Sequence, residues 1–324
     1  MIVVLAGGVG GARLARGIAR VVPAGDLSVV VNTADDFDHL GLSISPDLDT
    51  VMYTLAGLEN ASQGWGLTGE SWSFMAAMEK LGGETWFRLG DCDLATHVER
   101  TRRLTAGATL GDVTAQLCAA LGITARVLPM TNHRVRTIVH SDAGILPFQD
   151  YFVRRQCAPC IRGLEFEGAD AAAANPAAVA ALGDPALDAI VLAPSNPFVS
   201  VAPILAVSEL ARAIAIRKVP LVAVCPIVGG KAVKGPAAKM MAELGHEVSA
   251  LGVARHYGGV IDGLVVDTAD RDAAAAIRDL GLAVHVTDTI MSDDDGRRRL
   301  AADTLAFARE LRTDERWRTG RPIV

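Results

Sequence analysis

Acidic side chains gather near the start of the chain. Asp35, Asp36 and Asp38 follow an apolar run, and Asp47 and Asp49 come shortly afterwards. Carboxylates spaced along a loop can offer oxygen ligands to one hard cation, and Mg²⁺ usually takes one or two of them together with phosphates and waters. The cluster therefore predicts binding of a divalent metal or of a substrate. A helix cap is the alternative for Asp47 and Asp49, because a helical pattern follows both.

A glycine-rich loop precedes the acidic cluster. It spans residues 6–13, between a short apolar run and a helical pattern, and contains Gly7, Gly8, Gly10 and Gly11. Glycines let a backbone approach a phosphate closely, and the N–H groups that begin a helix attract anions. The loop is neither a strict dinucleotide fingerprint nor a P-loop, since the Lys-Ser/Thr ending is absent. We predict contact with a phosphate or nucleotide; a tight turn that binds nothing is the alternative.

A third polar segment covers residues 89–97 and continues to Arg100. Asp93 is suited to cap a helix on which His97 and Arg100 lie one turn apart. This pattern is compatible with an anionic ligand held by His97 and an arginine. It is equally compatible with an ion-paired surface, and the sequence leaves both open.

Two later loops also follow apolar runs. Ser195 and Asn196 lie between two prolines, and Lys231 and Lys234 flank a glycine-rich segment. Ligands of open α/β sheets bind at the carboxyl ends of strands, and lysines can balance phosphate charge. We therefore predict ligand contacts in both loops. The alternatives are a rigid turn in the first loop and solvated lysines in the second.

Other features restrict the class of protein. Five cysteines in irregular spacing suit a reducing cytoplasm, and we interpret Cys157 and Cys160 as ordinary thiols because no second pair or suitable histidine completes a zinc site. No secretory signal is visible, and prolines interrupt the longest uncharged stretch, residues 189–208, so we expect no membrane span. Serine-hydrolase and HExxH zinc-protease motifs are absent.

Short apolar runs alternate with helical patterns along the chain. The expected strands are residues 2–5, 27–31, 125–128, 137–140, 189–192, 221–224, 263–266 and 283–286. The expected helices include residues 14–22, 203–217, 236–244, 272–280 and 297–311. This alternation predicts an α/β fold, with a mostly parallel sheet covered by helices on both faces.

The middle of the chain is less regular. Residues 58–122 are mostly helical in pattern, and residues 132–172 contain strand-like pieces, among them residues 148–153. We predict a single domain, residues 1–324, in which residues 132–172 form a small insertion or cap. The 324 residues are 50% apolar and carry a net charge of −6, which argues against a disordered chain and against a basic nucleic-acid-binding surface.

The motifs together resemble the 2-phospho-L-lactate transferases of coenzyme F-420 biosynthesis. The matching segments follow the order of that family: residues 5–13, 32–36, 45–55, 89–97, 148–153, 193–197 and 226–231. The resemblance implies a Rossmann-like core, Mg²⁺ dependence and a homodimer. It also implies transfer of a phosphorylated three-carbon acid from its guanosine diphosphate ester to the ribityl hydroxyl of the deazaflavin Fo, with release of GMP. Whether the acid is 2-phospholactate, phosphoenolpyruvate or 3-phosphoglycerate stays open.

The resemblance also implies roles for individual residues. The metal aspartates correspond to Asp35 and to Asp47 or Asp49, and our working hypothesis places Mg²⁺ on Asp35 and Asp49. Asp36 or Asp47 would take the hydroxyl proton, and the glycine loop with Lys231 or Lys234 would bind phosphate oxygens. Further expected ligand contacts are Ser195, Asn196, Thr50, Asp93 and His97.

Two alternatives come from other classes of protein. A related group, with a similar glycine-rich start, binds nucleotide sugars and regulates gluconeogenesis and cell-wall synthesis without catalysis. A generic NAD-dependent enzyme has less support, because Asn32 stands where an acidic residue would bind the ribose. Ligand preference distinguishes these classes: guanosine diphosphate and deazaflavin for the transferase, and a uridine diphosphate sugar for the regulator.

Overall fold

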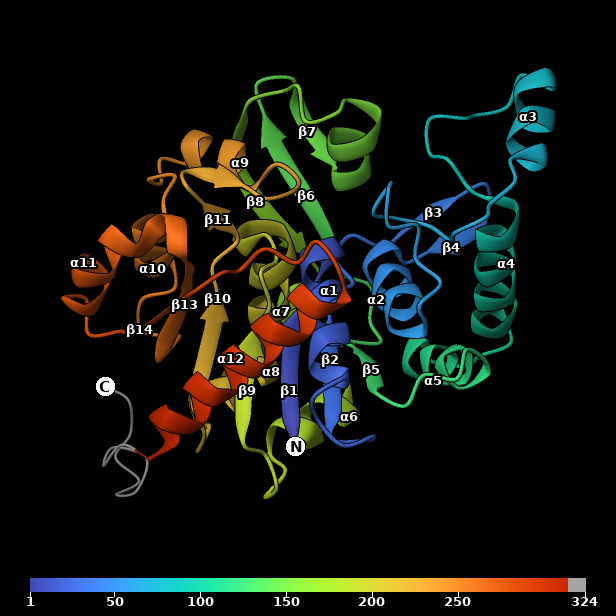
Figure 1. The fold of residues 1–324 in the computed structure, drawn as a ribbon. Helices are drawn as coiled ribbons and strands as arrows, with labels where there is room; N and C mark the ends of the chain where they lie inside the picture. Colours follow the sequence, from blue (N-terminus) through green and yellow to red (C-terminus); the bar gives the residue numbers. More distant parts are fainter. Residues whose placement is uncertain (314–324) are drawn as a thin grey trace.

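The computed structural model describes residues 1–313 and is built around a seven-stranded parallel sheet (Figure 1). The strand order is β14-β13-β10-β9-β1-β2-β5. The strands are β1 (Ile2–Ala6), β2 (Leu27–Val31), β5 (Arg126–Pro129), β9 (Ala189–Leu192), β10 (Leu221–Val224), β13 (Gly263–Asp267) and β14 (Ala283–Thr287). The order reverses between β1 and β9, as in doubly wound nucleotide-binding folds, so ligands are expected at the carboxyl ends of these two strands.

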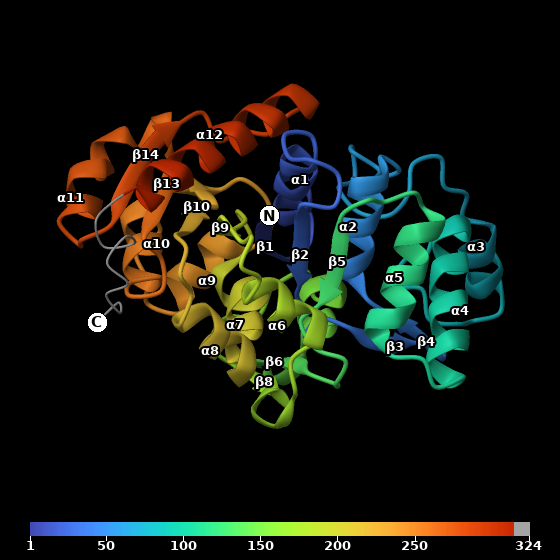
Figure 2. The same ribbon diagram turned by 90° about the horizontal axis from the view of Figure 1, so that it is seen from below.

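The strands are continuous apolar runs because both faces of the sheet are covered. All five residues of β1 are buried, and its side chains alternate between two hydrophobic clusters. Val3 and Leu5 join the cluster that includes residues of α7 and α8, whereas Ile2 and Val4 join the cluster of α1, α2 and α12. Figure 2 shows these two groups of helices on opposite sides of the sheet. The predicted α/β fold with a Rossmann-like parallel sheet is confirmed.

Most predicted helices are present, with some changes in extent. The helices are α1 (Gly8–Ala19), α2 (Pro46–Ala56), α3 (Ser73–Lys80), α4 (Asp91–Thr105), α5 (Leu110–Ala120), α6 (Pro176–Leu182), α7 (Ala202–Ala206), α8 (Ser208–Ala215), α9 (Ala237–Glu243), α10 (Ala250–His256), α11 (Ala274–Arg278) and α12 (Asp294–Arg312). The single helix predicted over residues 203–217 is wrong. It is divided into α7 and α8 because Val207 between them adopts an extended backbone.

A small antiparallel sheet lies beside the carboxyl edge of the large one. It comprises β6 (Arg136–Ser141), β7 (Gly144–Pro147) and β8 (Ile161–Glu167), with β6 in the centre. Two short hairpins complete the strands, β3 (Phe37–His39) with β4 (Leu42–Ile44) and β11 (Ile227–Val228) with β12 (Lys231–Ala232). The predicted extent of the domain, residues 1–324, includes residues 314–324, which lie outside the described part.

The prediction of a strand-like segment at residues 148–153 is wrong. Residues Asp150–Arg154 form a short π-helical turn instead. The spacing of the aromatic residues explains the difference: Phe148 and Tyr151, three positions apart, are both buried, and the rings of Phe148 and Phe152, four positions apart, stack at 5.3 Å. Apolar residues three and four apart are typical of a helical turn rather than a strand.

Among residues 1–313, no single helix is long and apolar enough to cross a membrane. The pair Pro197–Ala206 and Ser208–Ala215 has the length and composition when taken together, but the two parts meet at 90°. Its apolar residues, among them Val201, Ile204 and Leu210, belong to the core.

Candidate active site

The loop after β1 packs closely against the loop after β9. The Gly7 N–H donates to Ser195 Oγ at 3.1 Å, and the Ser195 hydroxyl donates to the Gly7 carbonyl at 2.8 Å. A Cβ at Gly10 would lie 2.3 Å from the carbonyl oxygen of Pro194, and Gly8 has a φ of +61°. The glycines therefore allow two loops to meet where the strand order reverses, and α1 begins at this junction.

Asp47 lies at the first turn of α2 and points toward the start of α1. Its Oδ1 accepts a hydrogen bond from the Gly8 N–H at 2.7 Å, and its Oδ2 accepts one from Asn32 Nδ2 at 3.0 Å. The N-cap of α2 is Ser45, so the capping alternative for Asp47 and Asp49 is wrong. Asn32 at the end of β2 holds this carboxylate, which gives the residue a different role from the ribose-binding acid of NAD enzymes.

Three buried carboxylates gather beside this junction. Asp35 Oδ1 accepts from the Thr137 hydroxyl at 3.2 Å, and Asp36 Oδ2 accepts from the Ser45 hydroxyl at 2.8 Å. Burial raises the pKa of Asp36 to about 8 and the pKa of Asp47 to about 6. Burial, together with the nearby Asp47 charge, also raises the pKa of Asp35 well above its usual value. Asp35 and Asp47 therefore lie close enough to repel each other when both are ionised.

These carboxylates fit a divalent cation. Asp36 Oδ1 is buried and has no hydrogen-bond partner among residues 1–313. Hard oxygen atoms are the ligands that Mg²⁺ prefers, and a nearby cation favours the ionised form of each carboxyl group. The donor set of Asp35, Asp36 and Asp47 therefore suits Mg²⁺ at the carboxyl ends of β1 and β2.

Asp49 belongs to a separate buried network. It pairs with the Arg100 guanidinium, with one Nη–Oδ contact at 3.1 Å, and lies 3.6 Å from His97 Nδ1. His97 Nε2 lies 3.3 Å from Asp93 Oδ2, and the Tyr53 hydroxyl donates to Asp93 Oδ1 at 2.7 Å. All five side chains are buried, so the network joins α2 to α4.

Atoms of Asp49, Asp93 and His97 also approach one another closely enough to surround a cation, within 4.8 Å. Arg100 already provides a positive charge against Asp49. The network therefore explains why these residue types occur together without a metal. The ion pairs expected here lie in the interior, not on the surface.

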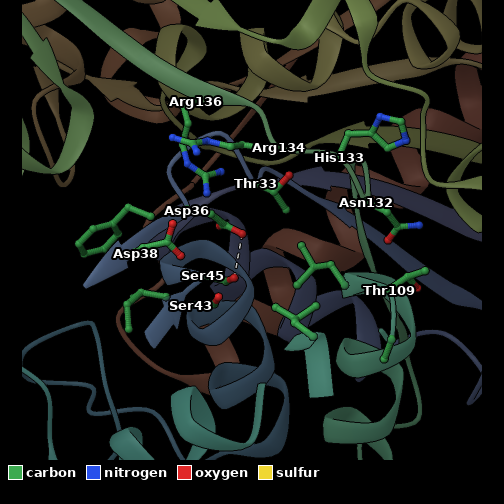
Figure 3. A pocket seen from close by; sticks show the side chains of 15 residues that line it. Thr33, Asp36, Asp38, Ser43, Ser45, Thr109, Asn132, His133, Arg134 and Arg136 are labelled. Carbon is green, nitrogen blue, oxygen red and sulfur yellow. Dashed lines mark hydrogen bonds between the residues drawn. The ribbon is translucent and has the colours of Figure 1, made fainter. Parts of the chain in front are cut away.

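Two cavities lie on either side of the segment that carries Asp36 and Asp38. Their volumes are about 360 Å³ and about 640 Å³. Both are lined by Asp36, Phe37, Asp38, Arg134 and Arg136. Figure 3 shows the first cavity, with Arg134 and Arg136 across from Asp36 and Ser45. The second cavity also reaches Asp35, and is otherwise lined by Ala34, Trp86, Thr137, Ile138, Pro147, Phe148, Gln149, Asp150, Arg154, Arg155 and Glu167.

Comparison with known proteins places this chain in a family. A family model described as 2-phospho-L-lactate transferase CofD matches residues 2–305. The chain belongs to the 2-phospho-L-lactate transferase family. It is therefore a transferase, and the resemblance seen in the motifs is confirmed.

Relatives in this family share nearly the whole length of the chain. A phosphoenolpyruvate transferase of Streptomyces coelicolor is 42% identical over 317 residues, covering 96% of this chain and 99% of the relative. A 2-phospho-L-lactate transferase of Methanosarcina mazei is 36% identical over 299 residues, covering 92% of this chain and 97% of the relative.

A solved structure shares the fold of this chain. It is a UPF0052 family protein of Bacillus halodurans, with a TM-score of 0.60, 16% identity, and coverage of 94% of this chain and 98% of that protein.

The remaining predicted site residues of this transferase lie in varied surroundings. Lys234 is exposed, and its Nζ donates to the carbonyl of Gln63 at 2.9 Å. Lys231 is exposed on β12, and Thr50 is half-buried on α2. Asn196 caps the π-helical turn Pro197–Val201, accepting from the Phe198 N–H at 3.0 Å. Of the residues predicted to bind phosphate, Gly7 of the glycine loop and Ser195 contact each other directly.

Several residues that surround the carboxylates of this transferase were not predicted from the sequence. Thr137 and Gln149 come from residues 132–172, and both bind Asp35, Gln149 through the Asp35 carbonyl at 3.0 Å. Arg134 and Arg136 reach the cavities from the same segment. The only available signal was the pair of arginines two positions apart, next to the predicted strand at residues 137–140. Nothing in that pattern indicated what they would face.

Proposed function

We propose that this transferase moves a phosphorylated three-carbon acid from its guanosine diphosphate ester to the ribityl hydroxyl of Fo, releasing GMP, in coenzyme F-420 biosynthesis. The observation that carries the proposal is the group of buried carboxylates, Asp35, Asp36 and Asp47, placed between the glycine loop and two cavities. The family names of the relatives support the class of acid, phospholactate or phosphoenolpyruvate.

The reaction needs a proton acceptor next to the attacking hydroxyl. A new P–O bond forms as the hydroxyl oxygen attacks, the P–O bond to the GMP phosphate breaks, and the hydroxyl proton must leave. Asp36 lines both cavities and has one oxygen without a partner among residues 1–313. We assign the proton-accepting role to Asp36. Burial raises its pKa to about 8 in the metal-free chain, and a cation held by Asp35 and Asp47 would favour the ionised form that can accept the proton.

Asp35 and Asp47 would hold Mg²⁺, in place of the Asp35 and Asp49 pair expected from sequence. Arg100 already neutralises Asp49, whereas Asp47 lies at the start of α1 and within electrostatic reach of Asp35. Bound Mg²⁺ supplies positive charge that stabilises the phosphoryl oxygens during transfer. Asn32 and the Gly8 N–H hold the Asp47 carboxylate in position.

The larger cavity suits the deazaflavin. Its volume of about 640 Å³ lies within the usual range of small-molecule sites, and Phe37, Trp86 and Phe148 contribute aromatic rings to its lining. Asp35 and Asp36 lie in the wall of the same cavity, so a hydroxyl of a ligand bound there can approach both. We further propose a homodimer in the cytoplasm, as the family resemblance implies.

A reconstitution experiment tests this proposal. The purified chain is mixed with Fo, Mg²⁺ and each of the three guanosine diphosphate esters, and deazaflavin product and GMP are followed by chromatography with mass detection. We expect both products from at least one ester, and the productive ester identifies the donor acid. An absence of product from all three esters would refute the proposed reaction.

A further inference from the structure

Arg134 and Arg136 are the two arginines that line both cavities. Arg136 is the first residue of β6, and the exposed Arg134 precedes it by two positions, across the fully buried Val135. Arg136 is half-buried, and one of its Nη atoms donates to the Val135 carbonyl at 2.8 Å. Both side chains reach the same two cavities, so the two guanidinium groups share one wall. Figure 3 shows them across from Asp36 and Ser45.

Neither guanidinium has an ion-pair partner within the described part of the chain, where no carboxylate oxygen lies within 4.0 Å of either. The other two arginines of the larger cavity are paired: Arg155 binds Asp150 at 2.8 Å, and Arg154 binds Glu84 at 3.0 Å. Burial lowers the pKa of Arg136, which shows that its charge has lost hydration. A partly desolvated cation without a carboxylate partner is suited to an anionic ligand.

The carboxyl groups that face Arg136 leave room for such a ligand. Asp36, Asp38 and Glu167 are within electrostatic reach of the guanidinium but beyond 4.0 Å. The wall next to the reacting centre therefore carries two guanidinium groups that no carboxylate of the described residues binds directly.

We propose that Arg134 and Arg136 bind the carboxylate of the three-carbon acid in the donor. This inference rests on the proposed function, in which that acid is attached to the phosphorus that Fo attacks. Its carboxylate must then lie only a few bonds from the reacting atoms, as the two arginines lie next to Asp36. A guanidinium matches a carboxylate with two parallel hydrogen bonds, which gives orientation as well as attraction.

The same chemistry would suit a phosphate oxygen of the nucleotide, and the experiment separates the two sources. The kcat/KM is measured for the productive ester and for its carboxamide analogue, with wild type, Arg136→Gln, Arg134→Gln and the control Arg162→Gln. Arg162 lies on β8 of the same small sheet and is exposed. GMP affinity is measured by calorimetry for each variant, and thermal unfolding shows that each is folded.

For a carboxylate site, Arg136→Gln lowers kcat/KM for the natural ester about ten- to a hundred-fold, the usual effect of losing one charged hydrogen-bonded contact. For the wild type, replacing the natural ester with its carboxamide lowers kcat/KM by a similar factor, whereas Arg136→Gln has nearly the same kcat/KM for both donors. The GMP affinity of Arg136→Gln equals that of the wild type, and so does the kcat/KM of Arg162→Gln. Arg136→Lys recovers part of the kcat/KM that Arg136→Gln loses. The proposal would be overturned if wild type and both arginine variants distinguished the natural ester from the carboxamide equally well. A loss of GMP affinity that parallels the loss of kcat/KM would also overturn it.

Binding of the esters without Fo separates this inference from the transfer reaction. If no product forms but the wild type binds an ester and Arg136→Gln binds it more weakly, the carboxylate site stands and the proposed reaction fails. If product forms while Arg134→Gln and Arg136→Gln act as wild type, the reaction stands and the site fails. A chain that binds none of the three esters refutes both.

Discussion

At the scale of single residues, ionisation of the buried carboxylates controls the site. Asp36 and Asp47 have pKa values of about 8 and about 6, in both cases because burial disfavours the charged form. The free chain therefore retains protons that a solvated aspartate would lose near pH 4. A bound cation reverses this preference and couples metal binding to proton release.

This coupling predicts how stability changes with pH. Without divalent cations, the free energy of unfolding should fall as pH rises from about 4 to about 8, because the folded chain binds more protons than the unfolded chain in that window. Each raised carboxyl group contributes up to about 1.4 kcal/mol per pH unit. Urea unfolding at several pH values measures the slope, and added Mg²⁺ should restore stability mainly at the alkaline end.

Matched variants identify the group responsible for this slope. Asp36→Asn should flatten the slope between about pH 6 and pH 8, whereas Asp38→Asn, which alters an exposed neighbour, should leave it as in wild type. A slope that Asp36→Asn does not change would contradict the assigned ionisation of Asp36.

Asp47 and Asp49 offer a second test at this scale. Asp47→Asn should raise the Mg²⁺ concentration needed for half-maximal turnover by about 100-fold or more, since even indirect partners of metal ligands are worth about 10- to 100-fold. Asp49→Asn should act mainly on stability, because it leaves Arg100 buried without its carboxylate. Mg²⁺ titration of turnover measures the first effect and urea unfolding the second. If instead Asp49→Asn raised the Mg²⁺ requirement and Asp47→Asn acted mainly on stability, the metal ligands would be Asp35 and Asp49, as expected from the sequence.

At the scale of secondary-structure elements, contacts on two sides hold α2 in position. Asp47 connects its first turn to α1, and Asp49 and Tyr53 connect it to α4 through Arg100 and Asp93. The buried network of α2 and α4 thus supports the helix whose first turn carries Asp47. His97 and Asp93 are bonded within this network, and their expected contact with a ligand stays a prediction.

Arg100→Met tests this connection. Removing one member of a buried ion pair leaves an unpaired buried charge, so we expect a loss of about 3–5 kcal/mol in the free energy of unfolding. Arg102→Met on the same helix is the control, because Arg102 pairs with Glu99 at the exposed surface and should change stability little. Urea denaturation measures both variants. Equal stability of the two would show that the α2–α4 network contributes nothing.

At the scale of the whole molecule, the site combines parts that are far apart in the sequence. The loops after β1 and β2 of the large sheet supply the glycines and Asp35, and the small sheet supplies Thr137 and Arg136, with Arg134 just before it. The two cavities lie where these parts meet. Ligand preference is therefore a property of the assembled fold.

Thermal unfolding with different nucleotides tests that preference. We expect GMP and guanosine diphosphate with Mg²⁺ to raise the Tm, since a ligand that binds only the folded chain stabilises it. NAD should have no such effect, because Asn32 binds Asp47 where an NAD enzyme has a ribose-binding acid. Stabilisation by a uridine diphosphate sugar but not by guanosine nucleotides would favour the regulator class.

The alternation of strands and helices was predictable from the sequence alone, because apolar runs and glycine-rich loops are local signals. The ordered motifs also indicated the family, and they placed Asp35, Asp36, Asp47 and the glycine loop near one sheet edge. Local patterns indicated a strand at residues 148–153, where the three- and four-residue spacing of aromatic rings instead forms a helical turn.

Only the tertiary structure separated Asp47 from Asp49. The two are two positions apart on one helix, where successive residues turn by about 100°, so they face different neighbours. One meets the start of α1 and the other meets Arg100, which is 51 positions away in the sequence. The sequence also could not show that Arg134 and Arg136 lack a carboxylate partner among the described residues, because charge pairing depends on distances between segments that no local pattern records.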